Sequence, residues 1–369
     1  MVSSKGRGPK KQLERFRSKI DEVDDKILKL LNRRAGLVQK VGNVKNRLGK
    51  GSPARKVLYR PEREKSILRR LTKSNSGPFP APSVVPVFTE IISACRSLEI
   101  GLQIAYLGPE ATFTHQAAQK HFGHHAYYHP MRTIHEIFNA VERGLCDHGL
   151  APIENSTGGT VGETLDCFVD SDLQITGEVQ LRISYNLYSK AGKIEKVRRI
   201  YSHPQAIAQS WGWIRSHLPD AEIMEVSSTA EAARKAKSDD TSAAITGKPA
   251  GQMYGLKPLA ECIEDYHENF TRFLVIGRDS THPTGEDRTS LLLSLKDEPG
   301  ILFKALEPFA RKGLNMSKIE SRPLKQKAWE YLFFIDVDGH QEDSTIKEAI
   351  KEVKTYCLFL KVLGSYPRD

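Results

Sequence analysis

The first residue that suggests chemistry is an arginine inside an apolar helical pattern. Apolar residues recur at alternating steps of four and three, which is typical of a long packed helix: Phe16, Ile20, Val23, Ile27, Leu30, Leu37, Val41, Val44 and Leu48. Position 34 belongs to this seam and is Arg34. Lys45 follows after about three helical turns, so both cations point the same way, and Arg17 lies beside the seam.

A cation in an apolar seam needs an anion, because a buried charge without a partner is costly. For Arg34 taken alone, pairing with an internal Glu or snorkelling to solvent stays open. Binding of nucleic acid requires cations on an exposed face and does not explain this position. A small dianion enclosed by helices does. The helix over residues 16–48 would extend about 50 Å, so we expect it to pack against a second copy of itself.

Four polar loops form the second candidate site. Each joins an expected strand to an expected helix: GPEATFTHQAA (108–118), PIENSTGGTVGETLD (152–166), SHPQAIAQS (202–210) and SSTAEAA (227–233). Helix N-termini offer N–H groups to anions, and open α/β sheets bind ligands at the carboxyl ends of strands. The four loops together predict a binder of small anions, although N-capping explains each loop singly.

Two further observations concern charged and metal-binding side chains. Thr271 and Arg272 lie in the apolar strand NFTRFLVIG, where an arginine is more often exposed at a sheet edge. Histidines are dense between positions 115 and 129 but lack ligand spacing, and no C-x-x-C pair occurs. We therefore expect no metal and no cofactor.

The composition sets the context of these sites. The chain of 369 residues is too long for one core, has a net charge of +10 and contains five scattered cysteines. Residues 1–100 hold 24 Lys and Arg against 9 Asp and Glu, so the basic excess lies there. No apolar run is long enough to span a membrane, and we expect no secretory signal because the basic N-terminal residues carry no apolar segment. We expect a cytoplasmic protein that binds neither membrane nor nucleic acid.

The elements that position these residues divide the chain into five segments. We expect a basic disordered tail (1–10), a helical domain (11–100) with a proline-rich loop at 73–86, and an α/β domain (101–279) with a largely parallel sheet. A polar linker (280–288) follows. The segment 289–369 has the order βαββαβ, which is the α+β ferredoxin-like arrangement.

The helical segment resembles the all-α chorismate mutase family through LERFRSKIDEVDDKILKLLNRRAGLVQKVGNVK, YRPEREKSILRRL and FTEIISACRSLE. The resemblance implies an intertwined homodimer that encloses chorismate. It implies that Arg34 binds a carboxylate, that Lys45 and Glu99 face the ether oxygen, and that Arg17 reaches in from the other chain. Arg63 and Glu64 would contact the remaining polar groups. Glu99 stands where a Gln is frequent, and a carboxyl must be protonated to donate; Arg60 stands where some members carry an acid.

The α/β segment resembles prephenate dehydratase through AYLGPEATFTHQAA, PIENSTGGTV, YSHPQAIAQS and TRF. The resemblance implies two lobes, periplasmic-binding-protein-like, around a cleft. By position, Thr271 would donate to the departing hydroxyl and Arg272 would hold a carboxylate. The substrate would be positioned by Glu154, Asn155, Ser202 and Gln209. Ala111 stands where a Gly is common.

The last segment resembles the ACT domain through EPGILFKAL and NMSKIESRP, and the resemblance implies phenylalanine as effector. The implied effector residues are Gly300, Asn315, Glu320, Ser321, Arg322 and Pro323. Taken together, these resemblances predict a bifunctional enzyme of phenylalanine biosynthesis that is feedback-inhibited by phenylalanine. Two alternatives stay open: a dehydratase that accepts arogenate, and a non-catalytic ligand-sensing regulator.

Overall fold

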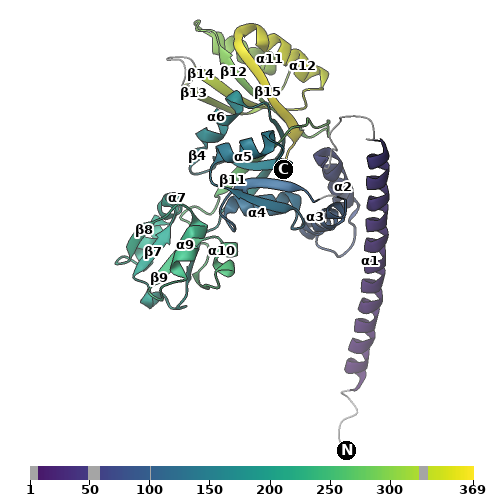
Figure 1. Ribbon diagram of the computed structural model, residues 1–369, viewed down its shortest axis with the longest axis vertical. Coiled ribbons are helices and arrows are strands. Elements are labelled where there is room, and N and C mark those ends of the chain that lie inside the picture. Colours follow the sequence, from purple (N-terminus) through teal and green to yellow (C-terminus); the bar gives the residue numbers. More distant parts are fainter. Residues whose placement is uncertain (1–6, 49–58, 100, 324–330) are drawn as a thin grey trace, which may run out of the picture.

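The computed structural model describes residues 7–48, 59–99, 101–323 and 331–369. These form a helical domain (7–99), a two-lobed domain (101–281) and a C-terminal domain (287–369), arranged around the two-lobed domain as Figure 1 shows. No helix among the described residues is long and apolar enough to cross a membrane.

The helical domain consists of α1 (Arg7–Leu48), α2 (Pro61–Ser74) and α3 (Ala81–Ser97), with α1 standing alongside the other two. The seam of α1 is half-exposed in the single chain; Phe16 is 53% exposed and Leu30 62%.

Two segment boundaries that the sequence predicted in this domain were wrong. Residues 7–10 belong to α1 and not to a disordered tail, since Pro9 in a first turn does not interrupt a helix. The rest of that tail lies outside the described residues.

The second correction concerns the proline-rich loop predicted over residues 73–86. α3 already begins at Ala81, with Pro82 in its first turn and Pro86 inside the helix. A proline in the first turn loses no hydrogen bond, because those N–H groups have no partner within the helix. The connection between α2 and α3 is therefore confined to residues 75–80.

The first lobe is built on a sheet of strand order β2-β1-β3-β11-β5, with β4 paired to β3. Its strands are β1 (Gln103–Leu107), β2 (Tyr127–Met131), β3 (His148–Asn155), β4 (Gly159–Thr160), β5 (Gln174–Arg182) and β11 (Phe270–Gly277). Its helices are α4 (Phe113–Phe122), α5 (Ile134–Glu142) and α6 (Gly162–Asp170). β2, β1 and β3 are parallel, whereas β11 is antiparallel to both of its neighbours. The prediction of a largely parallel sheet was therefore only partly correct, because β11 returns from the second lobe and inserts between β3 and β5.

The second lobe lies between β5 and β11 in the chain and has the strand order β10-β6-β9-β7-β8. Its strands are β6 (Asn186–Ser189), β7 (Arg199–Ser202), β8 (Glu222–Glu225), β9 (Ser242–Thr246) and β10 (Lys257–Ala260). Its helices are α7 (Pro204–Gln209), α8 (Trp211–His217), α9 (Thr229–Ala236) and α10 (Lys248–Met253). The chain thus crosses between the lobes twice, and the two lobes expected from the sequence are present.

The C-terminal domain has the predicted order βαββαβ. It contains β12 (Asp287–Leu295), α11 (Ile301–Arg311), β13 (Met316–Pro323), β14 (Tyr331–Asp338), α12 (Ser344–Val353) and β15 (Cys357–Pro367). The four strands form an antiparallel sheet of order β13-β14-β12-β15.

This domain is not a separate tail. Phe334 and Leu363 belong to the same buried cluster as Phe168 and Leu274 of the first lobe. Gly364, at φ 150°, lies so close to β5 that a Cβ would come within 2.3 Å of the Ile175 carbonyl oxygen. The connecting segment is packed as well: Thr281 is buried, and β12 already begins within the linker predicted over residues 280–288.

Candidate active sites

A pocket of about 300 Å³ lies among the three helices of the helical domain. It is lined by the polar side chains of Arg34, Arg60, Arg63, Glu64, Arg96 and Glu99, together with apolar residues of all three helices. Four residues singled out from the sequence, Arg34, Arg63, Glu64 and Glu99, are therefore brought to one place. A Cβ on Gly42 would lie 3.0 Å from Cδ of Glu99, which places the carboxyl against α1.

Several arginines in this pocket lack a carboxylate partner in the part of the chain that the structure describes. Arg34 Nη1 donates to the Ile91 carbonyl at 3.4 Å. Within the described residues, no carboxylate forms an ion pair with Arg34 or Arg63. An internal Glu partner for Arg34, one of the alternatives left by the sequence, is thus not found there. Arg34, Arg60 and Arg63 thus face the same pocket with no ion pair among the described residues and suit an anionic ligand.

Glu64 is the exception, because it has a partner that sequence reasoning missed. Arg96 donates to Glu64 Oε1 at 2.5 Å and to the Phe122 carbonyl at 2.7 Å. Burial raises the pKa of the Glu64 carboxyl, and Arg96 and Arg34 act in the opposite direction. Arg96 lies in the last turn of α3, three positions before Glu99, which follows the end of that helix, so the spacing could have indicated it.

The other two cations expected at this site are not placed in the pocket of the described chain. Arg17 is exposed on α1, about 25 Å along the helix from Arg34. Lys45 belongs to α1, but its side chain lies outside the described residues.

The second site lies where the two lobes meet, around Thr271 of β11 and Asn155 at the end of β3. Asn155 Nδ2 donates to Thr271 Oγ1 at 2.9 Å and to Asn269 Oδ1 at 2.7 Å. From the second lobe, Gln209 Nε2 donates to Asn155 Oδ1 at 3.3 Å, and Gln205 does so at 3.4 Å. Thr271 Oγ1 accepts a hydrogen bond here, so its own hydrogen is available for another acceptor.

Two residues of this network were not singled out from the sequence. Asn269 precedes β11 and donates to Gln209 Oε1 at 2.9 Å, while Gln205 lies inside the quoted SHPQAIAQS motif. Ser202 was singled out, but it is fully buried and donates to the Ile245 carbonyl at 2.7 Å. Its hydroxyl is directed at a neighbouring strand and not at Thr271.

Glu154 and Arg272 lie on the other face of the sheet, because successive side chains of a strand point to opposite faces. They are paired in register, as Asn155 and Thr271 are. Arg272 is 6% exposed and donates to Glu178 at 2.7 Å and to Asp336 of the C-terminal domain at 2.6 Å. The arginine expected to hold a substrate carboxylate therefore binds protein carboxylates at a domain boundary.

The loop that opens α4 carries a strained residue. Ala111 has a φ of 64°, the left-handed region in which glycine is favoured, and its N–H donates to His115 Nδ1 at 3.1 Å. A glycine would adopt this backbone conformation at lower cost than alanine does. Within the described residues, no group of three His, Cys, Asp or Glu side chains could hold a metal ion.

The residues expected to bind an effector divide between two sides of the C-terminal domain. Glu320 accepts from Thr160 at 2.9 Å and Arg322 lies 3.5 Å from Asp166, so both face the first lobe. Ser321, between them, is exposed. Gly300 precedes α11 with a φ of 75°, and Asn315 donates to Asp338 at 2.9 Å.

Comparison with known proteins agrees with this division of the chain. Residues 16–100 match the family described as chorismate mutase type II, residues 104–281 match prephenate dehydratase, and residues 289–355 match the ACT domain. The bifunctional chorismate mutase/prephenate dehydratase of Aquifex aeolicus is 45% identical over 97% of this chain and 98% of its own length. The protein of that name from Neisseria gonorrhoeae is 47% identical over 95% and 96%.

The chain belongs to the family of bifunctional chorismate mutase/prephenate dehydratases. Its helical domain is a chorismate mutase domain, its two-lobed domain is a prephenate dehydratase domain, and its C-terminal domain is an ACT domain. The resemblances seen in the sequence are confirmed, and the alternative of a non-catalytic regulator is not retained because these relatives are enzymes.

Two solved structures are similar to the dehydratase and ACT domains. The prephenate dehydratase of Arthrobacter aurescens in complex with L-Phe is 35% identical, with a TM-score of 0.67, and covers 72% of this chain and 90% of that one. The prephenate dehydratase of Staphylococcus aureus is 32% identical, with a TM-score of 0.64, and covers 72% and 100%.

Proposed function

We propose that the mutase pocket binds chorismate through Arg34 and Arg63, with Glu64 accepting from a substrate hydroxyl and Glu99 facing the ether oxygen. The single observation that supports this best is that Arg34 and Arg63, together with Arg60, face one pocket without an ion pair among the described residues. The rearrangement to prephenate is unimolecular and needs no nucleophile. The pocket acts by selecting the compact conformer and by stabilising charge on the breaking C–O bond.

The pocket is completed by a second chain in this proposal. The half-exposed apolar seam of α1 supports packing against another copy, because so long an apolar stripe is costly in water. Arg17 is too far along α1 to serve the pocket of its own chain and would serve that of the other chain. Lys45 would contact the ether oxygen. Sedimentation or light scattering of the purified protein should therefore give at least a dimer.

In the dehydratase domain, Thr271 would donate to the hydroxyl that leaves from the ring while Asn155 holds the threonine in place. Loss of carbon dioxide supplies the electron pair that completes the aromatic ring, and the leaving hydroxyl takes a proton to become water. Asn155 and Gln209 connect the two lobes, which supports binding of substrate between them in the manner of periplasmic-binding-protein-like domains. Arg272 and Glu154, on the opposite face, would support this site indirectly.

One observation favours a second substrate. A protein of Arabidopsis thaliana described as arogenate dehydratase/prephenate dehydratase 2 is 36% identical over 73% of this chain. Arogenate carries an amine where prephenate has a keto group. Initial rates with each substrate, supplied separately, distinguish the two proposals.

We propose phenylalanine as effector because the Arthrobacter aurescens relative is a complex with L-Phe. Gly300, Asn315, Ser321 and Pro323 would contact it, while Glu320 and Arg322 face the dehydratase domain. The test of the whole proposal is to supply the purified protein with chorismate and to follow prephenate and phenylpyruvate, with and without phenylalanine. Failure to form phenylpyruvate from either chorismate or prephenate would refute the dehydratase assignment.

A further inference from the structure

The edge strand of the ACT sheet, β13, presents alternate residues to the dehydratase domain. Lys318, Glu320 and Arg322 are half-buried, whereas Ile319 and Ser321 between them are exposed. Strand geometry requires this division, since neighbouring side chains point to opposite faces. One strand therefore contacts the dehydratase with one face and solvent with the other.

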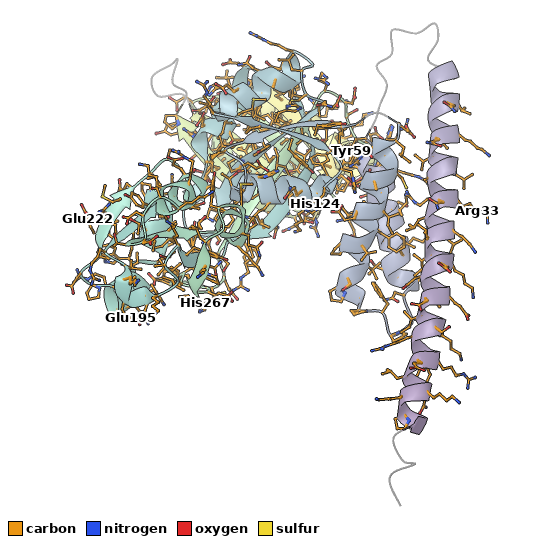
Figure 2. The ribbon with its side chains drawn as sticks, turned by 60° about the horizontal axis from the view of Figure 1, so that its bottom comes forward. Arg33, Tyr59, His124, Glu195, Glu222 and His267 are labelled. Atoms are coloured by element: carbon orange, nitrogen blue, oxygen red, sulfur yellow. The ribbon has the colours of Figure 1, made fainter. Side chains whose placement is uncertain are left out.

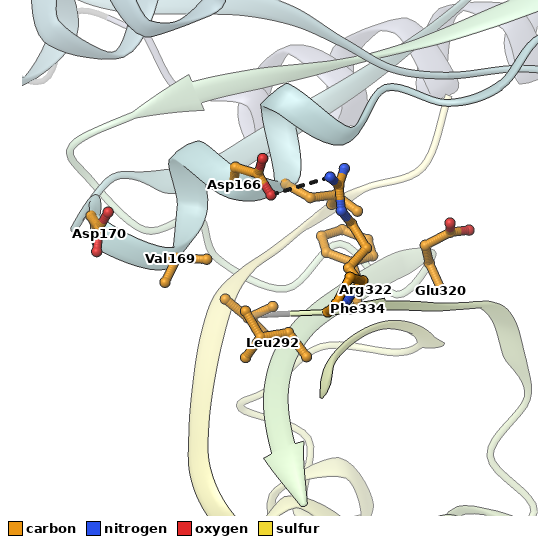
Figure 3. Close-up of a pocket in the computed structure, with 10 residues that line it drawn as sticks. Asp166, Val169, Asp170, Leu292, Glu320, Arg322 and Phe334 are labelled. Carbon is orange, nitrogen blue, oxygen red and sulfur yellow. Dashed lines mark ion pairs between the residues drawn. The ribbon is translucent and has the colours of Figure 1, made fainter. Parts of the chain in front are cut away.

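The three half-buried side chains contact three successive parts of the dehydratase domain. Lys318 Nζ forms an ion pair with Glu154 at the end of β3 and lies 3.4 Å from Thr160 Oγ1 of β4. Thr160 donates to Glu320 at 2.9 Å. Farther along, Arg322 reaches Asp166 of α6 at 3.5 Å, as Figure 3 shows.

The segment held in this way carries a residue of the dehydratase site. β3 and β4 are joined by residues 156–158, and only two residue pairs connect these strands. β3 itself is paired to β11, but β4 is held to it by so few pairs that its placement depends on side-chain contacts. Asn155 lies inside this β3–β4 hairpin, accepts from the N–H of Gly158 at 2.8 Å and donates to Thr271 at 2.9 Å. The ACT domain thus holds one face of a hairpin whose other face positions Thr271.

Lys318 is the main cation available to Glu154. Arg272 lies 3.6 Å from Glu154, but its guanidinium is shared with Glu178 and Asp336 at 2.7 and 2.6 Å. Burial acts to raise the pKa of Glu154, yet Lys318 and Arg272 together hold it below its ordinary value. Without Lys318, the partly buried carboxylate would keep only a distant and already shared partner.

We propose that Lys318 is a positioning residue of the dehydratase, which acts through Glu154 to fix Asn155 and Thr271. We further infer that β13 conveys effector binding to the site, because the face that carries Ser321 and the face that carries Lys318 belong to one strand. This second part rests on the proposed effector function. A ligand that prefers one placement of β13 changes the contacts that Lys318 and Glu320 make with Glu154 and Thr160.

The test uses Lys318→Met in the full-length protein. We expect kcat with prephenate to fall about tenfold or more, because a small misplacement of reacting groups has effects of this size. The KM for prephenate and the mutase activity should stay within twofold. Lys318→Arg should restore kcat, since a cation again faces Glu154. Lys347→Met, which removes an exposed lysine from α12 of the same domain, is the matched control and should behave as wild type.

A double-mutant cycle separates positioning through Glu154 from a general structural role. Glu154→Gln and the double variant Glu154→Gln/Lys318→Met should have the same kcat, because the lysine acts only through this carboxylate. Multiplicative losses in the double variant would overturn the proposal. So would a kcat for Lys318→Met that equals that of wild type. If Lys318→Met does not fold, Lys318→Gln is compared in the same cycle.

The role of β13 in inhibition by phenylalanine is tested by a separate measurement. Phenylalanine should inhibit wild type, whereas saturating phenylalanine should inhibit Lys318→Met far less completely although it binds with unchanged affinity in calorimetry. Unchanged inhibition of Lys318→Met would overturn the role of β13. Absence of inhibition in wild type would instead refute the effector assignment and leave the double-mutant cycle as the test of positioning.

Discussion

Arg96 of α3 and Glu64 of α2 form an ion pair of 2.5 Å inside the mutase pocket, and the same guanidinium donates to the Phe122 carbonyl of the dehydratase domain. Arg96 also lies over the ring of Tyr59, which donates to or accepts from His121 at 2.7 Å. Figure 2 shows Tyr59 between the helices and the dehydratase domain. One arginine therefore opposes the rise that burial causes in the pKa of Glu64 and connects the two catalytic domains.

Arg96→Met should shift the pH dependence of the mutase. Burial raises the pKa of Glu64 and Arg96 opposes this, so removing Arg96 raises that pKa further. Glu64 must be ionised to accept from a substrate hydroxyl, so the acidic limb of kcat/KM should move upward by about 1–3 pH units. Profiles with chorismate give the measurement, and Arg96→Lys should show a smaller shift. An unmoved acidic limb would show that Glu64 does not govern it.

Arg34→Ala should abolish most mutase activity and leave the dehydratase intact. Arg34 has no carboxylate partner among the described residues, so its contact with substrate is lost without compensation. Loss of one buried charge contact costs about 2–5 kcal/mol, which is roughly a thirtyfold or larger fall in kcat/KM. Arg33→Ala is the matched control, since Figure 2 shows Arg33 turned away from α2 and α3. Mutase activity within threefold of wild type would contradict the assignment.

Glu99→Gln should increase mutase turnover at neutral and alkaline pH. An amide donates a hydrogen bond at every pH, whereas a carboxyl donates only when protonated. The ratio of variant to wild-type turnover should therefore exceed one. Glu62→Gln, on α2 and outside the lining of this pocket, serves as control. A ratio of one or less would mean that Glu99 does not act as a hydrogen-bond donor to the ether oxygen.

Thr271→Val should remove dehydratase activity and spare the mutase. Valine has a similar shape but cannot donate, and loss of a positioned donor costs about 10²-fold or more. It also leaves Asn155 Nδ2 with one acceptor fewer. Thr271→Ser should retain activity, because the hydroxyl remains. Rates with prephenate and with chorismate, measured on the same preparation, provide the comparison; equal dehydratase rates for Thr271→Val and wild type would exclude Thr271 as the donor.

The sequence was sufficient for patterns that repeat along one element. The seam of α1 and the βαββαβ order rest on periodicities of a helix and of strands, and both appear in the structure. Asn155 and Thr271 could be proposed together from the motifs that carry them. The start of α3 was misplaced because prolines indicate loops, although a first turn accepts them.

What the sequence could not supply were contacts between distant segments. Lys318 and Glu154 are 164 positions apart, and no local pattern relates them. Arg272 illustrates a different reason. Its position next to Thr271 suggested a shared role at the substrate, but strand alternation turns the two side chains to opposite faces. The rule was available from the sequence, whereas the partner on the far face, Asp336 of another domain, was not.

Arg272→Met should destabilise the protein strongly. The arginine is 6% exposed, and its partners Glu178 and Asp336 are 1% and 0% exposed. Removing the cation leaves buried carboxylates with less compensation, which typically costs about 3–5 kcal/mol. Arg288, 2.6 Å from Glu178, compensates for one of them, so we expect the lower end of that range.

The measurement is the free energy of unfolding from urea denaturation of the full chain, followed through the transition that reports the dehydratase and ACT domains. Arg234→Met is the matched control: its arginine is 61% exposed and pairs with Glu231 on the same helix, so we expect a change below about 0.5 kcal/mol. If Arg272→Met instead unfolds like wild type but binds prephenate much more weakly, the arginine serves the substrate directly and the domain boundary does not depend on it. The structure favours a loss of stability in Arg272→Met, because the two closest acceptors of this guanidinium are carboxylates of two different domains.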